Sequence, residues 1–121
     1  MGAFIKVFVY GTLRAGGSNH HLMRTANLVM KNVCLSGYIM YDFGPYPFVT
    51  PCKDESRFIV GEIYEIPSNL LAVLDALEGI EEGLYERIFE PRIGAWLYIS
   101  GRNAPRNLPE IASGDWFKRH S

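Results

Sequence analysis

This chain has few cysteines, no block of like charge and no long apolar run, and each absence argues against a class of protein. Its two cysteines, Cys34 and Cys52, are not spaced as metal ligands and are expected to be reduced thiols. The formal net charge is −1, which disfavours a basic nucleic-acid-binding face and a polybasic membrane surface. The apolar runs fall short of the roughly 18 residues that a membrane-spanning helix needs.

Histidines and targeting signals are scarce as well. His20 and His21 are adjacent and therefore point apart, and His120 is remote in sequence, so we expect no metal site. The N-terminus leads directly into a β-rich run, without the apolar region and cleavage site of a signal peptide, and Lys6 breaks the myristoylation pattern. We expect a cytoplasmic protein with no nucleic-acid or membrane partner. The length of 121 residues predicts one domain over residues 1–121, and the composition is that of an ordinary globular protein.

The order of predicted elements indicates an α+β domain. β-Branched and aromatic residues predict a strand at 4–10, and a pair of weaker strands is expected in 27–42, with a break near Ser36-Gly37. The main helix is predicted at 68–79, with Ser68 as its cap and Gly79 just past its end. The other expected elements are a short helix at 19–26 capped by Ser18 or Asn19, a Pro-rich loop at 42–52 with at most short edge pairing, strands at 57–66, 84–90 and 94–100, and a turn-rich tail at 101–121. This content favours a strongly curved sheet or a small barrel.

One carboxylate lies among the leucines of the main helix. On a wheel with Leu74 at zero, Leu70, Leu71 and Leu77 fall within about 60° and Glu78 at about +40°. Burial and the negative end of the helix dipole would both raise the pKa of this carboxyl, which suits general acid–base chemistry. The alternative is that the last turn frays and Glu78 swings into water, as we expect for the loop residues Glu81 and Glu82.

The first strand ends in a glycine-rich segment, VFVYGTLRAGGSN at residues 7–19. Gly11 to Gly16 matches the start of a phosphate-binding loop, but Gly17-Ser18 follows where such a loop has Lys-Ser, so that interpretation fails. The remaining functional interpretation is that backbone N–H groups of Gly11-Thr12-Leu13 receive a carboxylate or an oxyanion. The alternative is an ordinary glycine-rich turn.

Two segments in this order resemble one protein family. They are FVYGTLRAGGSNH at 8–20 and LDALEGIEEGLYERI at 74–88, and together they resemble the gamma-glutamylcyclotransferase-like superfamily. GEIYEI at 61–66 and GDW at 114–116 extend the similarity over nearly the whole chain, with most likeness to the bacterial YtfP-like branch. The resemblance implies a small mixed β-barrel with one main helix, a short helix and a pocket at one end.

The resemblance also implies the residues of an active site. Glu78 is the expected acid–base residue, and the expected substrate-binding residues are Tyr10, Gly11, Thr12, Leu13 and Tyr85, with residues 14–19 as the rim. The implied substrate is a small gamma-glutamyl compound, which would be cyclised to 5-oxoproline without a metal or cofactor. The alternative is a non-catalytic protein of the same fold that binds an amino-acid-like carboxylate. The oligomeric state and the substrate's amine stay open.

Overall fold

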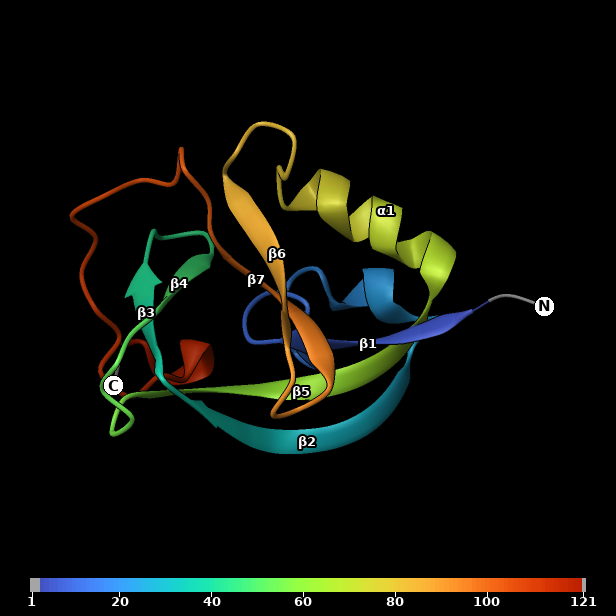
Figure 1. The fold of residues 1–121 in the computed structure, drawn as a ribbon, viewed down its shortest axis with the longest axis horizontal. Coiled ribbons are helices and arrows are strands. Elements are labelled where there is room, and N and C mark those ends of the chain that lie inside the picture. The colour runs from blue at the N-terminus through green and yellow to red at the C-terminus, as the bar shows by residue number, and fades with distance from the viewer. Residues whose placement is uncertain (1–2, 121) are drawn as a thin grey trace.

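The computed structural model describes residues 3–120, and its main element is a curved five-stranded sheet (Figure 1). The strand order is β2-β5-β1-β7-β6, with β1 and β7 parallel and the other neighbours antiparallel. The strands are β1 (Phe4–Val9), β2 (Asn27–Ser36), β5 (Phe58–Pro67), β6 (Tyr85–Glu90) and β7 (Ala95–Ser100). The predicted strands therefore form, each within about two residues of its expected bounds, as is normal for strand ends.

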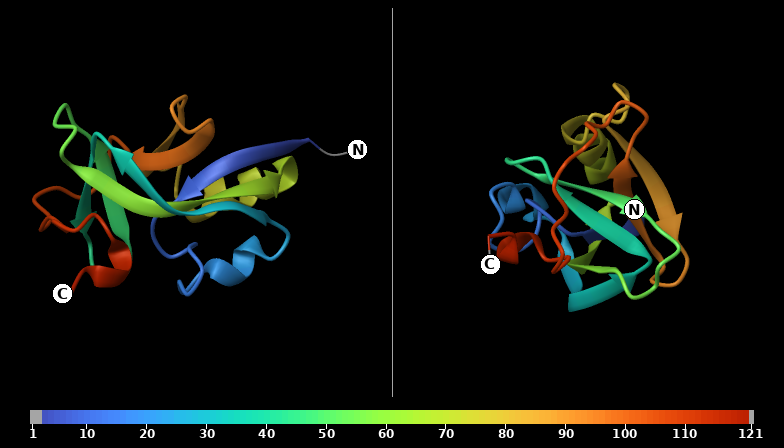
Figure 2. Two further views of the ribbon diagram at one scale, coloured as in Figure 1. Left: turned by 90° about the horizontal axis from the view of Figure 1, so that it is seen from below. Right: turned by 90° about the vertical axis from the view of Figure 1, so that its left-hand side faces the viewer.

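A second, two-stranded sheet is formed by β3 (Tyr38–Asp42) and β4 (Pro47–Pro51), so the Pro-rich loop contains a paired strand. The expected closed barrel is wrong, because within residues 3–120 these two sheets do not join into one ring. One edge of β3 pairs with β4, and its other edge pairs with the tail, where the Ile111 N–H donates to the Met40 carbonyl at 2.8 Å. The hairpin therefore lies at one end of the curved sheet (Figures 1 and 2).

Alternation along β1 supplies two apolar clusters, one on each face of the sheet. Val7 and Val9 belong to the cluster that contains Leu74 of α1 (Ser68–Leu77), whereas Phe8 packs in the cluster that contains Trp116. This division follows from the two-residue period of a strand. Helix α1 begins beside the start of β1, and its C-terminal residues Leu77 and Glu78 line one pocket with the end of β1 and the glycine-rich segment.

The ends of α1 match the prediction only in part. Ser68 does not cap the helix through its side chain, since Pro67 occupies the N-cap position and the Ser68 N–H donates to the Ala3 carbonyl at 2.9 Å. At the other end Gly79 has φ +64°, a left-handed conformation that glycine adopts without strain, and it ends the helix as expected. Glu78 remains on the helical path, because its N–H donates to the Leu74 carbonyl at 2.9 Å.

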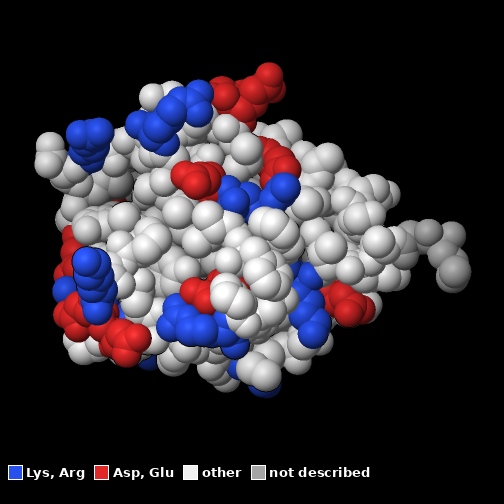
Figure 3. Space-filling model, viewed as in Figure 1, with Lys and Arg blue, Asp and Glu red and all other residues white. Residues whose placement is uncertain are grey.

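Two single 3₁₀ turns complete the fold. The short helix expected at 19–26 is reduced to η1 (His20–Met23); Asn19 is in the cap position but its side chain makes no cap hydrogen bond. The tail ends in η2 (Trp116–Lys118), whose first turn is capped by the Asp115 carboxylate. No helix of residues 3–120 has the length and apolar character to cross a membrane. Acidic and basic side chains are interspersed on the face shown in Figure 3.

Candidate functional site

A pocket of about 160 Å³ lies where β1 ends, beside the C-terminus of α1. All six residues predicted for the site line it: Tyr10, Gly11, Thr12, Leu13, Glu78 and Tyr85. The other lining residues are Phe8, Val9, Asn19, Tyr46, Pro47, Leu77, Leu84 and Tyr98. The tertiary structure therefore brings the glycine-rich segment and the helix carboxylate, which are far apart in the sequence, into one cavity.

Glu78 is the only residue with a formally charged side chain at neutral pH among those that line the pocket in the described chain. Its side chain does not swing out into water, as the alternative interpretation required, because the last turn of α1 is intact and the residue is partly buried. Burial raises the pKa of the Glu78 carboxyl to about 7, and the negative charge of Asp75 adds to the shift. Near neutral pH this carboxyl therefore exchanges a proton readily in either direction.

Asp75 lies one turn before Glu78 on α1 and does not line the pocket, but its contacts, which the sequence did not reveal, support the site. Its carboxylate accepts a hydrogen bond from the Tyr98 hydroxyl at 2.7 Å and forms an ion pair with Arg87. These contacts fasten α1 to β6 and β7 one turn before Glu78. The signal in the sequence is the three-residue spacing between Asp75 and Glu78, which places two carboxylates on neighbouring positions of one helix side.

The hydroxyl protons of three tyrosines at the pocket are already engaged by the protein. Tyr10 donates to the Tyr98 carbonyl at 2.7 Å, Tyr85 donates to the Pro47 carbonyl, and Tyr98 donates to Asp75. Burial and the nearby negative groups raise the pKa of Tyr10 and of Tyr85, so both stay protonated. Toward a ligand, these oxygens can only accept hydrogen bonds.

Gly11, Thr12 and Leu13 of the glycine-rich segment line the same pocket. Among the described residues, the N–H groups of Thr12 and Leu13 donate to no other protein group, whereas the Arg14 N–H is used by the Gly11 carbonyl at 3.1 Å. Gly11 is required for space, because a Cβ at this position would lie 2.9 Å from the Pro47 ring. The residues that line the pocket therefore include two with unused backbone donors, together with tyrosines and a carboxyl group that can accept hydrogen bonds.

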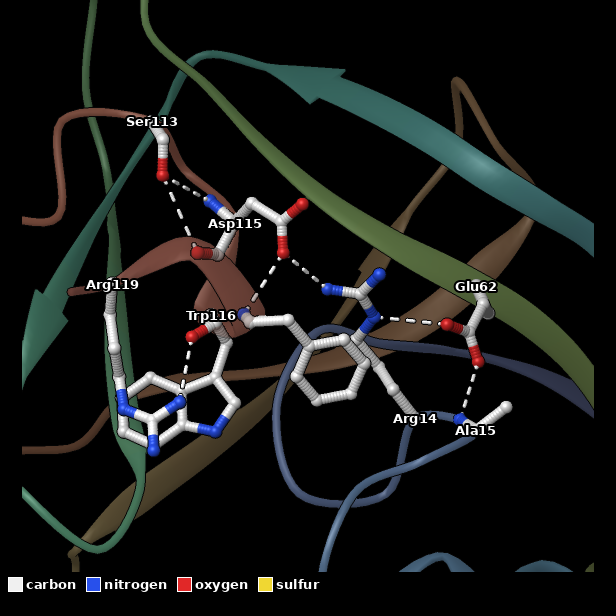
Figure 4. A network of polar contacts seen from close by, with 8 residues as sticks. Arg14, Ala15, Glu62, Ser113, Asp115, Trp116 and Arg119 are labelled. Carbon is white, nitrogen blue, oxygen red and sulfur yellow. Dashed lines mark hydrogen bonds and ion pairs between the residues drawn. The ribbon is translucent and has the colours of Figure 1, made fainter. Parts of the chain in front are cut away.

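The expected rim at residues 14–19 is mostly wrong, since only Asn19 of this range lines the pocket. Arg14 turns away into a polar network (Figure 4), where it pairs with Glu62 at 2.9 Å and Asp115 at 2.8 Å. Its guanidinium also stacks 4.3 Å from the Phe117 ring centroid, and the Ala15 N–H donates to Glu62 at 2.9 Å. The GDW segment therefore has a structural role, because the ion pair of Asp115 with Arg14 connects the tail to the glycine-rich segment.

Substitution of Glu78 with Gln is expected to stabilise the folded protein at alkaline pH. In the folded chain the pKa of the Glu78 carboxyl is about 7, whereas its ordinary value is 4.5. The neutral acid therefore contributes fully to the stability of the folded protein below pH 4.5, and this contribution is lost as the pH rises through 7. Gln avoids that loss. The free energy of unfolding, measured with urea at about pH 8.5, should therefore be about 2–3 kcal/mol higher for E78Q than for wild type.

At about pH 4 the two proteins should differ little, because both then carry a neutral side chain at this position. Glu81→Gln is the matched control, since Glu81 is exposed in the following loop. A gain of the same size at both pH values would contradict the raised pKa, and the test requires no substrate.

Comparison with known proteins gives a consistent result. The sequence profile of the family described as "Gamma-glutamyl cyclotransferase, AIG2-like" matches residues 7–118. The gamma-glutamylcyclotransferase family protein YtfP of Escherichia coli is 37% identical over 117 residues, which cover 95% of this chain and 98% of YtfP. The solution structure of E. coli YtfP superposes with a TM-score of 0.71 over 97% of this chain and 100% of that one. A gamma-L-glutamyl-butirosin B gamma-glutamyl cyclotransferase of Niallia circulans is 30% identical, over 91% of this chain and 74% of that protein.

Proposed function

Because this chain belongs to the AIG2-like gamma-glutamyl cyclotransferase family, we propose that it converts the gamma-glutamyl group of a small compound to 5-oxoproline and releases the attached amine. The observation that carries the proposal is that Glu78, whose carboxyl has a pKa of about 7, lines one pocket with residues 12 and 13, whose backbone N–H groups donate to no other protein group in the described chain. The name of the Niallia circulans relative supports it, because that protein is named as a gamma-glutamyl cyclotransferase of gamma-L-glutamyl-butirosin B.

The two sides of the pocket suit the two ends of a folded glutamyl group. The N–H groups of Thr12 and Leu13 would receive the α-carboxylate or the developing oxyanion of the γ-carbonyl. The acceptors Tyr10, Tyr85 and Glu78 would receive the α-ammonium group. Bound in this way, the α-nitrogen and the γ-carbonyl carbon are held together, and such positioning supplies much of the rate of an intramolecular reaction.

Glu78 would carry the proton that the reaction must move. Its carboxylate takes one proton from the α-ammonium, and the freed amine attacks the γ-carbonyl carbon to form the new C–N bond. Glu78 then returns this proton to the leaving nitrogen as the old C–N bond breaks. The remaining surplus proton on the lactam nitrogen passes through solvent to the released amine, so the products are 5-oxoproline and an ammonium ion. The cycle consumes no water and leaves Glu78 as it began.

The proposal is tested by incubating the protein with a panel of gamma-glutamyl amines and peptides and measuring 5-oxoproline by mass spectrometry. Saturable formation of the lactam that depends on enzyme concentration is the expected result. Saturable binding without any lactam would favour the alternative, a binding protein of the same fold that captures an amino-acid-like carboxylate. Absence of both binding and turnover over the whole panel would contradict the two functions together.

A further inference from the structure

The size of the pocket limits what part of a substrate it can hold. Its volume of about 160 Å³ is well below the roughly 300–1,000 Å³ of pockets that enclose a drug-sized ligand. If the pocket binds a folded glutamyl group, little space remains for the amine that leaves. The leaving group must therefore lie at the mouth of the pocket, and the residues there decide which leaving groups are accepted.

Several partly exposed side chains that line the pocket are apolar, beside the polar Thr12 and Asn19. Leu77 lines the pocket yet has 43% of its surface exposed, so it does not belong to the buried stripe of α1 as the helical wheel predicted. Leu77 is the last residue of α1, and Glu78, which follows it, is less exposed. Leu84 and Tyr46 also line the pocket, and Phe43, 41% exposed, packs on Tyr46 with ring centroids 5.2 Å apart. Exposed apolar side chains at the edge of a pocket gain free energy when a ligand covers them.

No cation lines this pocket in the described chain. Two arginines of the polar networks already form ion pairs within the protein. Arg14 pairs with Glu62 and with Asp115, and Arg87 pairs with Asp75. Arg102 and Arg106 line a different hollow, which also includes Phe48. The Phe48 ring is stacked 4.4 Å from that of Tyr85, which lines the pocket, so this aromatic pair lies between the two cavities. A carboxylate on the leaving group would therefore lose water without gaining a cation, which is unfavourable.

From this geometry, and resting on the proposed function, we infer that the enzyme selects gamma-glutamyl compounds whose leaving amine is apolar and carries no carboxylate. Leu77, Leu84 and Tyr46 are the residues that determine this specificity, with Phe43 behind Tyr46. Gamma-glutamyl derivatives of arylalkyl or branched alkyl amines satisfy the mouth of the pocket, whereas peptides that end in a free carboxylate do not.

The inference is tested by comparing kcat/KM for four substrates: γ-glutamyl-benzylamide, γ-glutamyl-isoamylamide, γ-glutamylglycine and glutathione. We expect the two amides to be preferred by about tenfold or more over the two acidic peptides. Equal or better use of the acidic peptides would overturn the inference and leave the proposed function standing. Failure to release 5-oxoproline from all four would instead contradict the proposed function, and the two failures are thus distinguishable.

A charge placed at the mouth should reverse the selectivity. Leu77→Lys would supply the missing cation, so the ratio of kcat/KM for γ-glutamyl-benzylamide to that for γ-glutamylglycine should fall by about tenfold or more. The ratio is the measured quantity because a lysine beside Glu78 would alter proton transfer for both substrates alike. Val73→Lys is the matched control: Val73 is 48% exposed on α1, one turn earlier, and does not line the pocket. An unchanged ratio in L77K, or an equal change in V73K, would overturn the inference.

Discussion

Substitution of Glu78 with Gln is expected to lower kcat for 5-oxoproline formation by about 10²–10⁴-fold, the usual contribution of a general acid–base group. Gln keeps the size and hydrogen-bonding shape of the side chain but cannot take up or return a proton. The pocket is otherwise unchanged, so KM should move far less than kcat. The measurement is steady-state kinetics on the best substrate of the gamma-glutamyl panel.

The pH dependence of the wild-type enzyme provides a second readout of the same residue. Because Glu78 must be ionised to accept the first proton and its pKa is raised to about 7, kcat/KM should fall as the pH drops below neutrality. Glu81→Gln should retain wild-type activity, since Glu81 lies exposed in the loop after α1 and does not line the pocket. Wild-type turnover by E78Q would show that another group moves the proton, and the proposed mechanism would then be wrong.

Substitution of Arg14 with Met is expected to destabilise the fold by about 3–5 kcal/mol, the cost of removing one partner of a buried ion pair. Arg14 and Glu62 are each only 6% exposed, and Arg14 also bridges to Asp115. Met fills the space of the aliphatic stem but leaves the Glu62 carboxylate without its cation, although Tyr64 and the Ala15 N–H still donate to it at 3.0 and 2.9 Å. Urea unfolding at neutral pH measures the loss.

A double variant separates the unpaired charge from the lost packing. In R14M/E62Q the uncompensated carboxylate is gone, so part of the stability lost in R14M should return. Arg24→Met is the control, because Arg24 is exposed and close in sequence to the same segment. Two results would contradict a stabilising role for the network in Figure 4. One is that R14M lowers the free energy of unfolding no more than R24M does, and the other is that R14M/E62Q is less stable than R14M.

The two halves of the glycine-rich segment, YGTL and the residues that follow it, contact different parts of the protein. The four residues of YGTL line the pocket, whereas Arg14, which follows them, does not line it and forms an ion pair with Asp115 of the tail. Sequence pattern identifies the segment as a unit but does not distinguish these contacts. Those of Arg14 depend on Glu62 and Asp115, which lie 48 and 101 positions along the chain from Arg14.

Local sequence determined the elements of this protein. β-Branched runs, leucine periodicity and Gly79 were sufficient to place the main helix and the strands other than β4, because these signals act over a few residues. The same periodicity placed Glu78 among apolar side chains, which is a property of one helix alone. The cap of this helix was not predictable from local sequence. The Ser68 N–H donates to the Ala3 carbonyl, and the Ser68 side chain does not cap the helix.

Tertiary structure decided the closure of the sheets and the composition of the pocket. The two sheets do not join, and the tail pairs with the second edge of β3. Leu77 is exposed although the helical wheel groups it with the other leucines. The contacts of Asp75 with Tyr98 and Arg87, and the engagement of the tyrosine protons, join residues from separate strands. Such contacts depend on which surfaces meet when the chain packs, and side-chain periodicity carries no information about the partner across the interface.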